Sequence, residues 1–222
     1  NSLKLMSQKI VFMGTRMFSV PILETLLNSN HKILTVYSQP ASKASRGQRV
    51  TPSSVEIFAK ERSLNLRTPH GLDNNEEYNF LKKLKPDIVV VVAYGKIIPK
   101  RFLNLAKFGF INIHASLLPK WRGAAPIQRS IMNLDNQTGI SIMRIVEKLD
   151  AGPVMLQDKV EIDEKINSLK LSKVLSKLGS RSIINAINKI EKGEAKFLEQ
   201  NHNEATYAKK ISKLEGRINW NE

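Results

Sequence analysis

The chain has 222 residues, of which 41% are hydrophobic and 25% charged, proportions that are ordinary for a globular protein with a sizeable core. It contains no cysteine, which excludes disulfides, thiolate catalysis and cysteine-ligated zinc, and its four histidines have no metal-ligand spacing. The formal net charge of +15 permits a nucleic-acid partner, although lysine spread along the whole chain equally suggests a compositional bias of the source.

The amino-terminal part of the chain has the pattern of half a Rossmann unit. A short apolar run ends at Gly14, a helix is expected at about residues 20–28, and a second strand at residues 33–38. The dinucleotide fingerprint G-x-G-x-x-G is missing, and no acidic residue ends the second strand. Binding of NAD, and with it a nicotinamide oxidoreductase, is therefore disfavoured.

A basic loop is expected next, at residues 41–52. It carries Lys43, Arg46 and Arg49 among small and polar residues, with no acidic residue nearby. Such a loop can follow a phosphate backbone or can be an ordinary solvated surface loop, and its composition favours neither interpretation.

The middle of the chain continues the alternation of helix and strand. Helices are expected at residues 55–62, after a cap at Ser53, and at residues 78–85. A continuous β-branched run within residues 86–94 is typical of a central parallel strand that is covered on both faces. This alternation predicts an α/β fold with a Rossmann-like open, mostly parallel, twisted sheet and helices on both of its faces.

Two polar residues lie near the end of the next strand, at residues 110–114. Two isoleucines alternate there with Asn112 and His114, so the two polar side chains share one face of the strand. We expect the preceding strand to end beside them, at Tyr94. A loop marked by proline and glycine follows, and open α/β sheets place their ligands at such an edge.

The rest of the chain is expected to form a helix, two strands and a long amphipathic helix. The second strand should be antiparallel, and the long helix should be interrupted or kinked near Gly179. The expected ranges are residues 125–132 for the first helix, 139–146 and 154–162 for the strands and 169–190 for the long helix. Asp150 lies between the two strands in a turn marked by glycine and proline, where aspartate is more often a turn former than a catalytic group.

The chemistry of Asn112, His114 and Asp150 fits acyl transfer if the fold brings them together at the carboxyl edge of the sheet. Asparagine can donate a hydrogen bond to a developing oxyanion, histidine can exchange a proton near neutral pH, and aspartate can orient it. Direct transfer to an amine is favoured over a covalent intermediate, because cysteine is absent and Ser116 lacks the setting of a nucleophile elbow. A single strand histidine can equally be structural.

Several separate motifs resemble the 10-formyltetrahydrofolate-dependent formyltransferases. The motifs of the shared core are residues 112–119, 121–123 and 149–153. Further segments resemble the branch of this family that acts on methionyl initiator tRNA, namely residues 13–15, 39–52, 91–95, 123–128, 207–211 and 217–220. The resemblance spans about residues 8–220.

The resemblance implies an enzyme that transfers a formyl group from 10-formyltetrahydrofolate to the amino group of methionyl initiator tRNA in translation initiation. The amine would attack the formyl carbonyl directly. Asn112 would hold the formyl oxygen, His114 would help to carry the proton of the amine, and Asp150 would assist through its charge and an ordered water. We expect a cytoplasmic monomer that needs no metal and has no membrane partner.

The resemblance also implies two binding surfaces and a domain boundary. Folate contacts are implied for Val91, Tyr94, Ser116, Leu117, Leu118 and Pro119, and tRNA contacts for Lys43, Arg46 and Arg49. Residues 1–205 are expected to be the catalytic domain, and residues 206–222 a linker toward a carboxyl-terminal barrel that the family carries. Because the chain stops before that barrel, we expect weak and strongly salt-dependent tRNA binding. Arg16 is a further departure, since the family usually has proline there.

Two other functions are kept as alternatives. A sugar-nucleotide N-formyltransferase would use the same folate donor and the same three catalytic residues, but it would have no reason to keep the basic loop. A non-catalytic RNA-binding remnant would be expected to have lost one of Asn112, His114 and Asp150, and all three are present.

Overall fold

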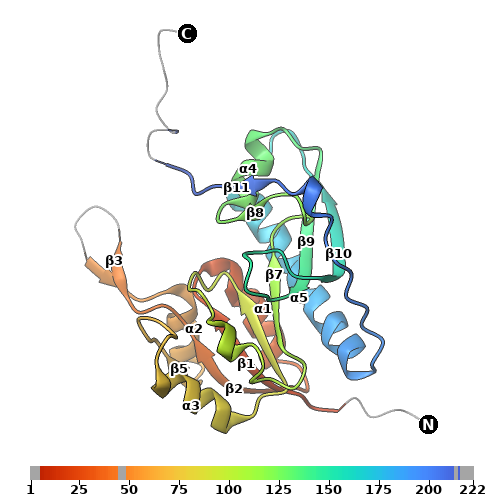
Figure 1. The fold of residues 1–222 in the computed structure, drawn as a ribbon. Coiled ribbons are helices and arrows are strands. Elements are labelled where there is room, and N and C mark those ends of the chain that lie inside the picture. Colours follow the sequence, from red (N-terminus) through yellow and green to blue (C-terminus); the bar gives the residue numbers. More distant parts are fainter. Residues whose placement is uncertain (1–5, 45–48, 213–214, 216–222) are drawn as a thin grey trace.

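The computed structural model of the chain describes residues 6–44, 49–212 and 215, and its centre is a seven-stranded sheet in the order β10-β9-β7-β6-β1-β2-β5 (Figure 1). Five neighbouring strands are parallel, and they are β1 (Lys9–Gly14), β2 (Lys32–Tyr37), β5 (Leu66–Arg67), β6 (Ile88–Val92) and β7 (Phe110–His114). β9 (Gln137–Arg144) is antiparallel to both of its neighbours, β7 and β10 (Val154–Glu161). The predicted Rossmann-like, mostly parallel α/β fold is thus confirmed.

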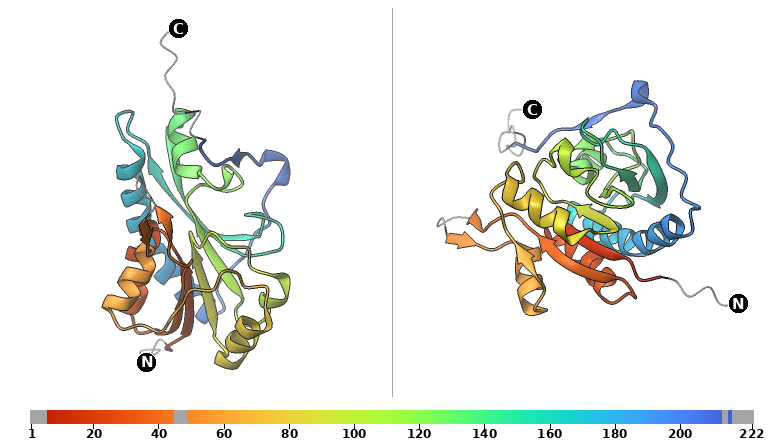
Figure 2. Two further views of the ribbon diagram at one scale, coloured as in Figure 1. Left: turned by 90° about the vertical axis from the view of Figure 1, so that its left-hand side faces the viewer. Right: turned by 60° about the horizontal axis from the view of Figure 1, so that its bottom comes forward.

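Helices cover both faces of this sheet (Figure 2). One face packs against α1 (Val20–Leu27), α2 (Ser54–Glu61) and α5 (Ser168–Glu191). The other packs against α3 (Asn75–Leu84) and the 3-10 turn η2 (Lys100–Phe102). α4 (Pro126–Met132) lies against α5, and two further 3-10 turns are η1 (Met17–Ser19) and η3 (His202–Glu204).

Alternate side chains of the central strand β6 build the two cores. Val90 and Val92 join the cluster that includes α1 and α5, whereas Val89 and Val91 join the cluster that includes α3. All residues of β6 are buried, as the continuous β-branched run predicted. Burial on both faces makes β6 a rigid support for whatever its carboxyl end carries.

The helix predicted at residues 78–85 begins earlier than expected, at Asn75. The side chain of Asn74 accepts a hydrogen bond from the Glu77 N–H at 2.8 Å, so Asn74 is the cap that fixes the first turn. The helix ends at Leu84 because Lys85 adopts a left-handed conformation with φ of +48°.

The predicted break in the long helix near Gly179 is wrong, since α5 is continuous from Ser168 to Glu191. Gly179 is buried, and a Cβ added to it would lie 3.3 Å from Ile22 and 3.4 Å from Ile113. The glycine therefore serves close packing of α5 on α1 and β7. A sequence pattern cannot distinguish this use of glycine from a helix break.

Three short pairings were not expected from the sequence. β5 adds an edge strand to the sheet. The predicted basic loop contains an antiparallel pair, β3 (Ser42–Ala44) with β4 (Arg49–Thr51). In the tail, β11 (Tyr207–Ala208) pairs in parallel with β8 (Arg122–Gly123). Strands of two or three residues are too short to show a hydrophobic period.

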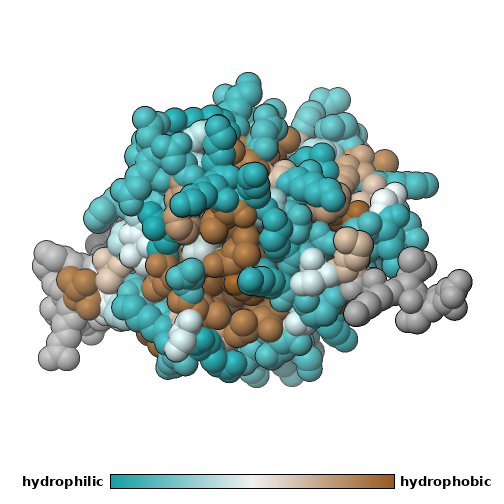
Figure 3. Space-filling model, turned by 90° about the horizontal axis from the view of Figure 1, so that it is seen from below, coloured by the Kyte–Doolittle hydropathy of each residue, from teal (hydrophilic) through white to brown (hydrophobic). Residues whose placement is uncertain are grey.

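The surface is mainly hydrophilic, as expected for a chain of this charge. Seen from below, one face has a hollowed apolar area at its centre, surrounded by hydrophilic side chains (Figure 3). In the part of the chain that the structure describes, no helix combines the length and the apolar character that crossing a membrane requires.

Candidate active site

β7 positions two of the three predicted catalytic residues. Asn112 lies opposite Val91 of β6, and His114 lies opposite Ser141 of β9. The two residues share one face of the strand, next to the carboxyl end of β6, as predicted. The amide of Asn112 forms no hydrogen bond with another residue of the described ranges, so it is available to an oxygen of a ligand.

The hydrogen bond at one ring nitrogen of His114 determines what the other nitrogen can do. Nε2 lies 2.7 Å from the carbonyl oxygen of Trp121, which can only accept, so Nε2 carries the proton of the neutral ring. Nδ1 lies 3.8 Å from Oδ2 of Asp150, with 7% of the His114 side chain and 11% of the Asp150 side chain exposed. A neutral His114 can therefore take up a proton only at Nδ1, beside the carboxylate.

The loop after β9 brings Asp150 to this position. Asp150 has a φ of +48°, a left-handed conformation that aspartate tolerates better than most residues. Its Oδ2 accepts a hydrogen bond from the Gly123 N–H at 2.8 Å. Gly123 has a φ of +108°, and a Cβ there would lie 3.0 Å from the Ala208 carbonyl oxygen. Residue 123 must therefore be glycine, because its backbone packs against β11 and also donates a hydrogen bond to the carboxylate of Asp150.

The predicted folate segment after β7 is held tightly by the two antiparallel strands. The Ser141 hydroxyl donates to the Ser116 carbonyl at 2.6 Å and accepts from the Leu118 N–H at 3.0 Å. Gln157 donates to the Leu118 carbonyl at 2.9 Å, and the Leu118–Pro119 peptide is cis. The Ser116 hydroxyl donates to the Lys120 carbonyl at 2.5 Å and is fully buried, so it is not placed as a nucleophile.

Leu117, which belongs to the same predicted segment, packs against β9. The Cδ2 atom of its side chain lies 2.7 Å from the position that a Cβ on Gly139 would take. The structure therefore brings residues 116–119 beside β7 and β9, with much of their polar backbone already bonded within the protein.

The second predicted folate segment, at the end of β6, is hydrogen-bonded to the residues that follow β1 and β2. The Tyr94 carbonyl accepts hydrogen bonds from the Thr15 hydroxyl at 2.7 Å and from the Gln39 amide at 2.8 Å. Val91 is buried, and so is the Tyr94 hydroxyl, which has no hydrogen-bond partner in the described part of the chain. Burial, and next the negative charge of Glu77, raise the pKa of the Tyr94 hydroxyl, which therefore stays protonated.

Two of the three residues predicted to bind tRNA lie on a separate hairpin. Lys43 and Arg49 belong to β3 and β4, which extend outward from the body of the molecule (Figure 1). Lys43 is opposite Val50 and Arg49 is opposite Ala44. Arg46 lies outside the described residues.

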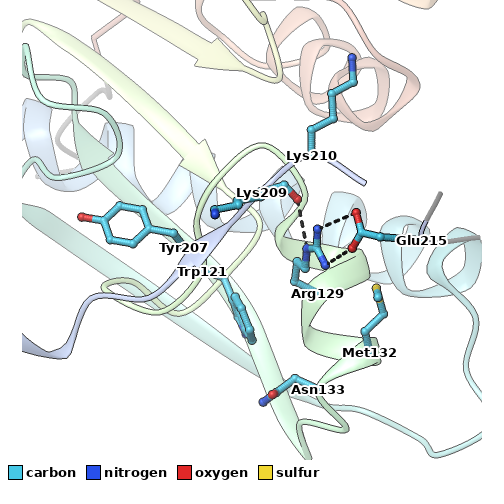
Figure 4. Close-up of a pocket in the computed structure, with 8 residues that line it drawn as sticks. All are labelled: Trp121, Arg129, Met132, Asn133, Tyr207, Lys209, Lys210 and Glu215. Carbon is cyan, nitrogen blue, oxygen red and sulfur yellow. Dashed lines mark hydrogen bonds and ion pairs between the residues drawn. The ribbon is translucent and has the colours of Figure 1, made fainter. Parts of the chain in front are cut away.

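A cavity of about 570 Å³ is lined by Trp121, whose backbone carbonyl contacts Nε2 of His114, and by residues of α4 and of the tail (Figure 4). Arg129 bonds there to the Lys209 carbonyl at 3.1 Å and to Glu215 at 2.7 Å. Hydrogen bonds from Arg129 and Ser212 lower the pKa of Glu215 to about 2. The lining residues are Trp121, Arg129, Met132, Asn133, Tyr207, Lys209, Lys210 and Glu215.

A second cavity, of about 500 Å³, lies between β5 and the start of α3. It holds the partly buried ion pair of Arg67 and Glu77, at 2.7 Å, and Tyr37 donates to Glu77 at 2.8 Å. Neither cavity is lined by Asn112, His114 or Asp150. Among the described residues, no cluster of three or more histidine, aspartate or glutamate side chains could hold a metal ion.

Two buried residues next to the trio were missed from the sequence. Gln200 donates to the carbonyls of Asp150 and Gly152, and Arg122 donates to the side-chain oxygen of Gln200. Arg122 lies inside a motif that carries the family resemblance, which was a usable signal. Gln200 lies in a polar stretch without periodicity, where no local signal marks it.

Known proteins are similar to this chain in sequence over most of its length. Residues 8–187 match the sequence family described as formyl transferase. The chain is 55% identical to the methionyl-tRNA formyltransferase of Pelagibacter ubique, over 98% of this chain and 70% of that protein.

Solved structures with low sequence identity share the fold. A phosphoribosylglycinamide formyltransferase from Anaplasma phagocytophilum has a TM-score of 0.70 at 18% identity, over 85% of this chain and 89% of that one. The sugar 3N-formyl transferase WlaRD, solved in the presence of dTDP and 5-N-formyl-THF, has a TM-score of 0.66 at 20% identity, over 96% of this chain and 72% of that one. The chain therefore belongs to the formyl transferase family, in the branch of the methionyl-tRNA formyltransferases.

Proposed function

We propose that this chain transfers a formyl group from 10-formyltetrahydrofolate to the amino group of methionyl initiator tRNA. The observation that carries the proposal is the convergence of Asn112, His114 and Asp150 at the carboxyl end of β7, in a chain 55% identical to a methionyl-tRNA formyltransferase. The arrangement contains an oxyanion donor, a proton acceptor and a fixed negative charge. These are the three functions that acyl transfer to an amine needs.

Asn112 stabilises the oxygen that becomes negative during the reaction. When the amine attacks the formyl carbon, the carbonyl electrons move to the oxygen, and the free amide N–H groups of Asn112 can donate to it. A donor that is already in place costs no reorganisation when the charge develops. Collapse of the tetrahedral intermediate re-forms the carbonyl and breaks the bond to the folate nitrogen.

His114 accepts the proton that the amine loses, and Asp150 stabilises the charge that this proton creates. The open nitrogen of His114, Nδ1, accepts it, and the imidazolium that forms lies 3.8 Å from the Asp150 carboxylate. Since that separation is longer than a hydrogen bond, Asp150 stabilises the imidazolium through its charge, and an ordered water bound to both groups would assist. The proton then passes to the folate nitrogen as it leaves, so the enzyme ends the cycle unchanged.

The folate donor is proposed to bind between the ends of β6 and β7. One predicted segment ends at Tyr94, after β6, and the other is formed by residues 116–119, after β7. Adjacent parallel strands bring both to one edge of the sheet. Because Ser116 and Leu118 are buried and bonded internally, exposed backbone of this segment, rather than the Ser116 hydroxyl, would contact the folate.

Features beside the trio support an RNA acceptor over a small sugar. The cavity of Figure 4 includes Tyr207, whose exposed fraction is 55%, and the exposed cations Lys209 and Lys210. Neither lysine forms an ion pair with another described residue. Aromatic rings beside unpaired cations are typical of surfaces that hold single-stranded nucleic acid. The β3–β4 hairpin, with Lys43 and Arg49, would supply further contacts to phosphates.

A formyl-transfer assay with 10-formyltetrahydrofolate tests the proposal, with methionyl initiator tRNA and amino-sugar nucleotides offered in parallel. We expect formylation of the tRNA, and His114→Ala should lower kcat at least about 100-fold, as removal of a general base does. Formylation of sugars alone would favour the sugar N-formyltransferase instead. A His114→Ala variant within a few-fold of the parent would remove His114 from the mechanism.

A further inference from the structure

Arg122 is an unusual residue to find next to a catalytic site, because it is fully buried without a carboxylate partner. Its exposed fraction is 0%, and it forms no ion pair with another residue in the described ranges. Nε and one terminal nitrogen donate to the side-chain oxygen of Gln200, at 3.1 and 2.7 Å. The same terminal nitrogen donates to Nδ1 of His202 at 2.9 Å, and the other is buried without a partner. Stability alone would favour an apolar residue here.

Gln200 links Arg122 to the loop that carries Asp150 by hydrogen bonds. With 8% of its surface exposed, it donates from Nε2 to the Asp150 carbonyl at 2.9 Å and to the Gly152 carbonyl at 2.7 Å. Because guanidinium groups only donate and carbonyls only accept, the orientation of the amide is fixed on both sides. Gln200 is therefore held by Arg122 and holds the loop.

Two consecutive residues of β8 thus fix Asp150 at two points. Arg122 acts on its backbone carbonyl through Gln200, and the Gly123 N–H binds its carboxylate directly at 2.8 Å. This double attachment fits the left-handed backbone of Asp150, which must be maintained by its surroundings. The two attachments hold Asp150 where its carboxylate lies 3.8 Å from His114.

We propose that Gln200 is a positioning residue of the formyl-transfer reaction, oriented by Arg122, which sets the carboxylate of Asp150 against His114. The inference rests on the proposed function, because it gives Asp150 its catalytic role. Gln200 itself touches no reacting atom. Its loss should therefore lower the rate of the chemical step and leave substrate binding largely intact.

Gln200→Glu separates this role from a structural one. Glutamate keeps the oxygen that accepts from Arg122 and adds an ion pair, but it cannot donate to the carbonyls of Asp150 and Gly152. Because the added ion pair with Arg122 offsets the repulsion between the new carboxylate oxygen and these two carbonyls, we expect the variant to fold with a melting temperature close to that of the parent. kcat should fall about 10- to 100-fold, the usual cost of losing a residue that orients a catalytic group, while KM for the folate donor stays within about threefold.

Two further variants complete the design. Gln200→Met removes both sets of hydrogen bonds at similar volume, so both kcat and the melting temperature should fall. Gln8→Glu makes the same chemical change at another buried glutamine, 6% exposed and next to the amino end of β1, and should leave kcat unchanged.

The proposal is overturned if Gln200→Glu keeps kcat within threefold of the parent. It is also overturned if both Gln200 variants fail to fold, which would assign the residue to stability. If the parent chain itself transfers no formyl group, the proposed function fails separately. In that case, amide hydrogen exchange measures whether Gln200 holds the loop of Asp150. Exchange should be faster at Ala151 and Gly152 in Gln200→Glu than in the parent, and it should be unchanged in Gln8→Glu.

Discussion

The substitution Asp150→Asn removes the charge beside His114 and leaves the loop geometry almost unchanged. The asparagine oxygen can still accept the hydrogen bond that Gly123 donates at 2.8 Å. The backbone carbonyl of residue 150 also keeps its bond from Gln200. The same oxygen, Oδ2, is the one nearest to Nδ1 of His114, so any loss of activity can be assigned to the carboxylate charge.

The geometry gives the size of the effect. His114 and Asp150 are separated by 3.8 Å and are largely buried, so an effective dielectric constant of about 20 gives an attraction of about 4 kcal/mol once the ring is protonated. Full loss of this attraction in the transition state corresponds to about 1,000-fold in rate. Since water partly replaces the interaction, we expect kcat to fall by about 100- to 1,000-fold.

Single-turnover formyl transfer with saturating folate donor measures this loss at the chemical step. Asp73→Asn is the matched control, because that carboxylate is 90% exposed and its ion pair is with Arg101, at 3.5 Å, rather than with a residue of the trio. The control should be as active as the parent. If Asp150→Asn retained kcat within fivefold, the carboxylate would not stabilise the imidazolium, and the role given to Asp150 would be refuted.

Two further substitutions test the supports of the fold and the site. Burial would raise the pKa of Glu77, but hydrogen bonds from Arg67 and Tyr37 outweigh it and hold the pKa below its usual range. Its stabilising effect is therefore complete above about pH 4.5 and is lost as the pH falls through the lowered pKa. Glu77→Gln should lower the free energy of unfolding at pH 7 by about 2 kcal/mol and flatten its dependence on pH in the acid range, as measured by urea unfolding at several pH values; an unchanged profile would contradict this. Gly152→Ala would place a Cβ 1.8 Å from the Arg144 carbonyl oxygen, so the loop must move, and kcat should fall at least about tenfold. Equal activity of this variant would show that the loop tolerates displacement.

Local patterns in the sequence were sufficient for most of the sheet and for two of the three residues of the trio. The β-branched run of β6 predicted a strand buried on both faces, and the alternation in β7 placed Asn112 and His114 on one side. Both follow from the two-residue period of a strand, which depends on neighbouring residues only. The start of α3 was predictable in principle, because Asn74 is a favourable cap that the pattern contained.

The antiparallel course of β9 and the hairpin β3–β4 were outside the reach of such patterns. A strand has the same period in either direction, so its neighbours decide its orientation. The break predicted at Gly179 failed for a related reason, because the close approach of α1 and β7 gives this glycine its purpose.

The sequence by itself therefore determined the fold class, the order of helices and strands and the residue types available for catalysis, and its motifs indicated the family. Only the tertiary structure decided that Asp150 meets His114 and that Gln200 and Arg122 hold it there. These contacts join residues 36, 50 and 78 positions apart, counted from 114 to 150, 150 to 200 and 122 to 200. Packing of loops on a finished sheet sets such distances, and no local preference of the chain encodes them.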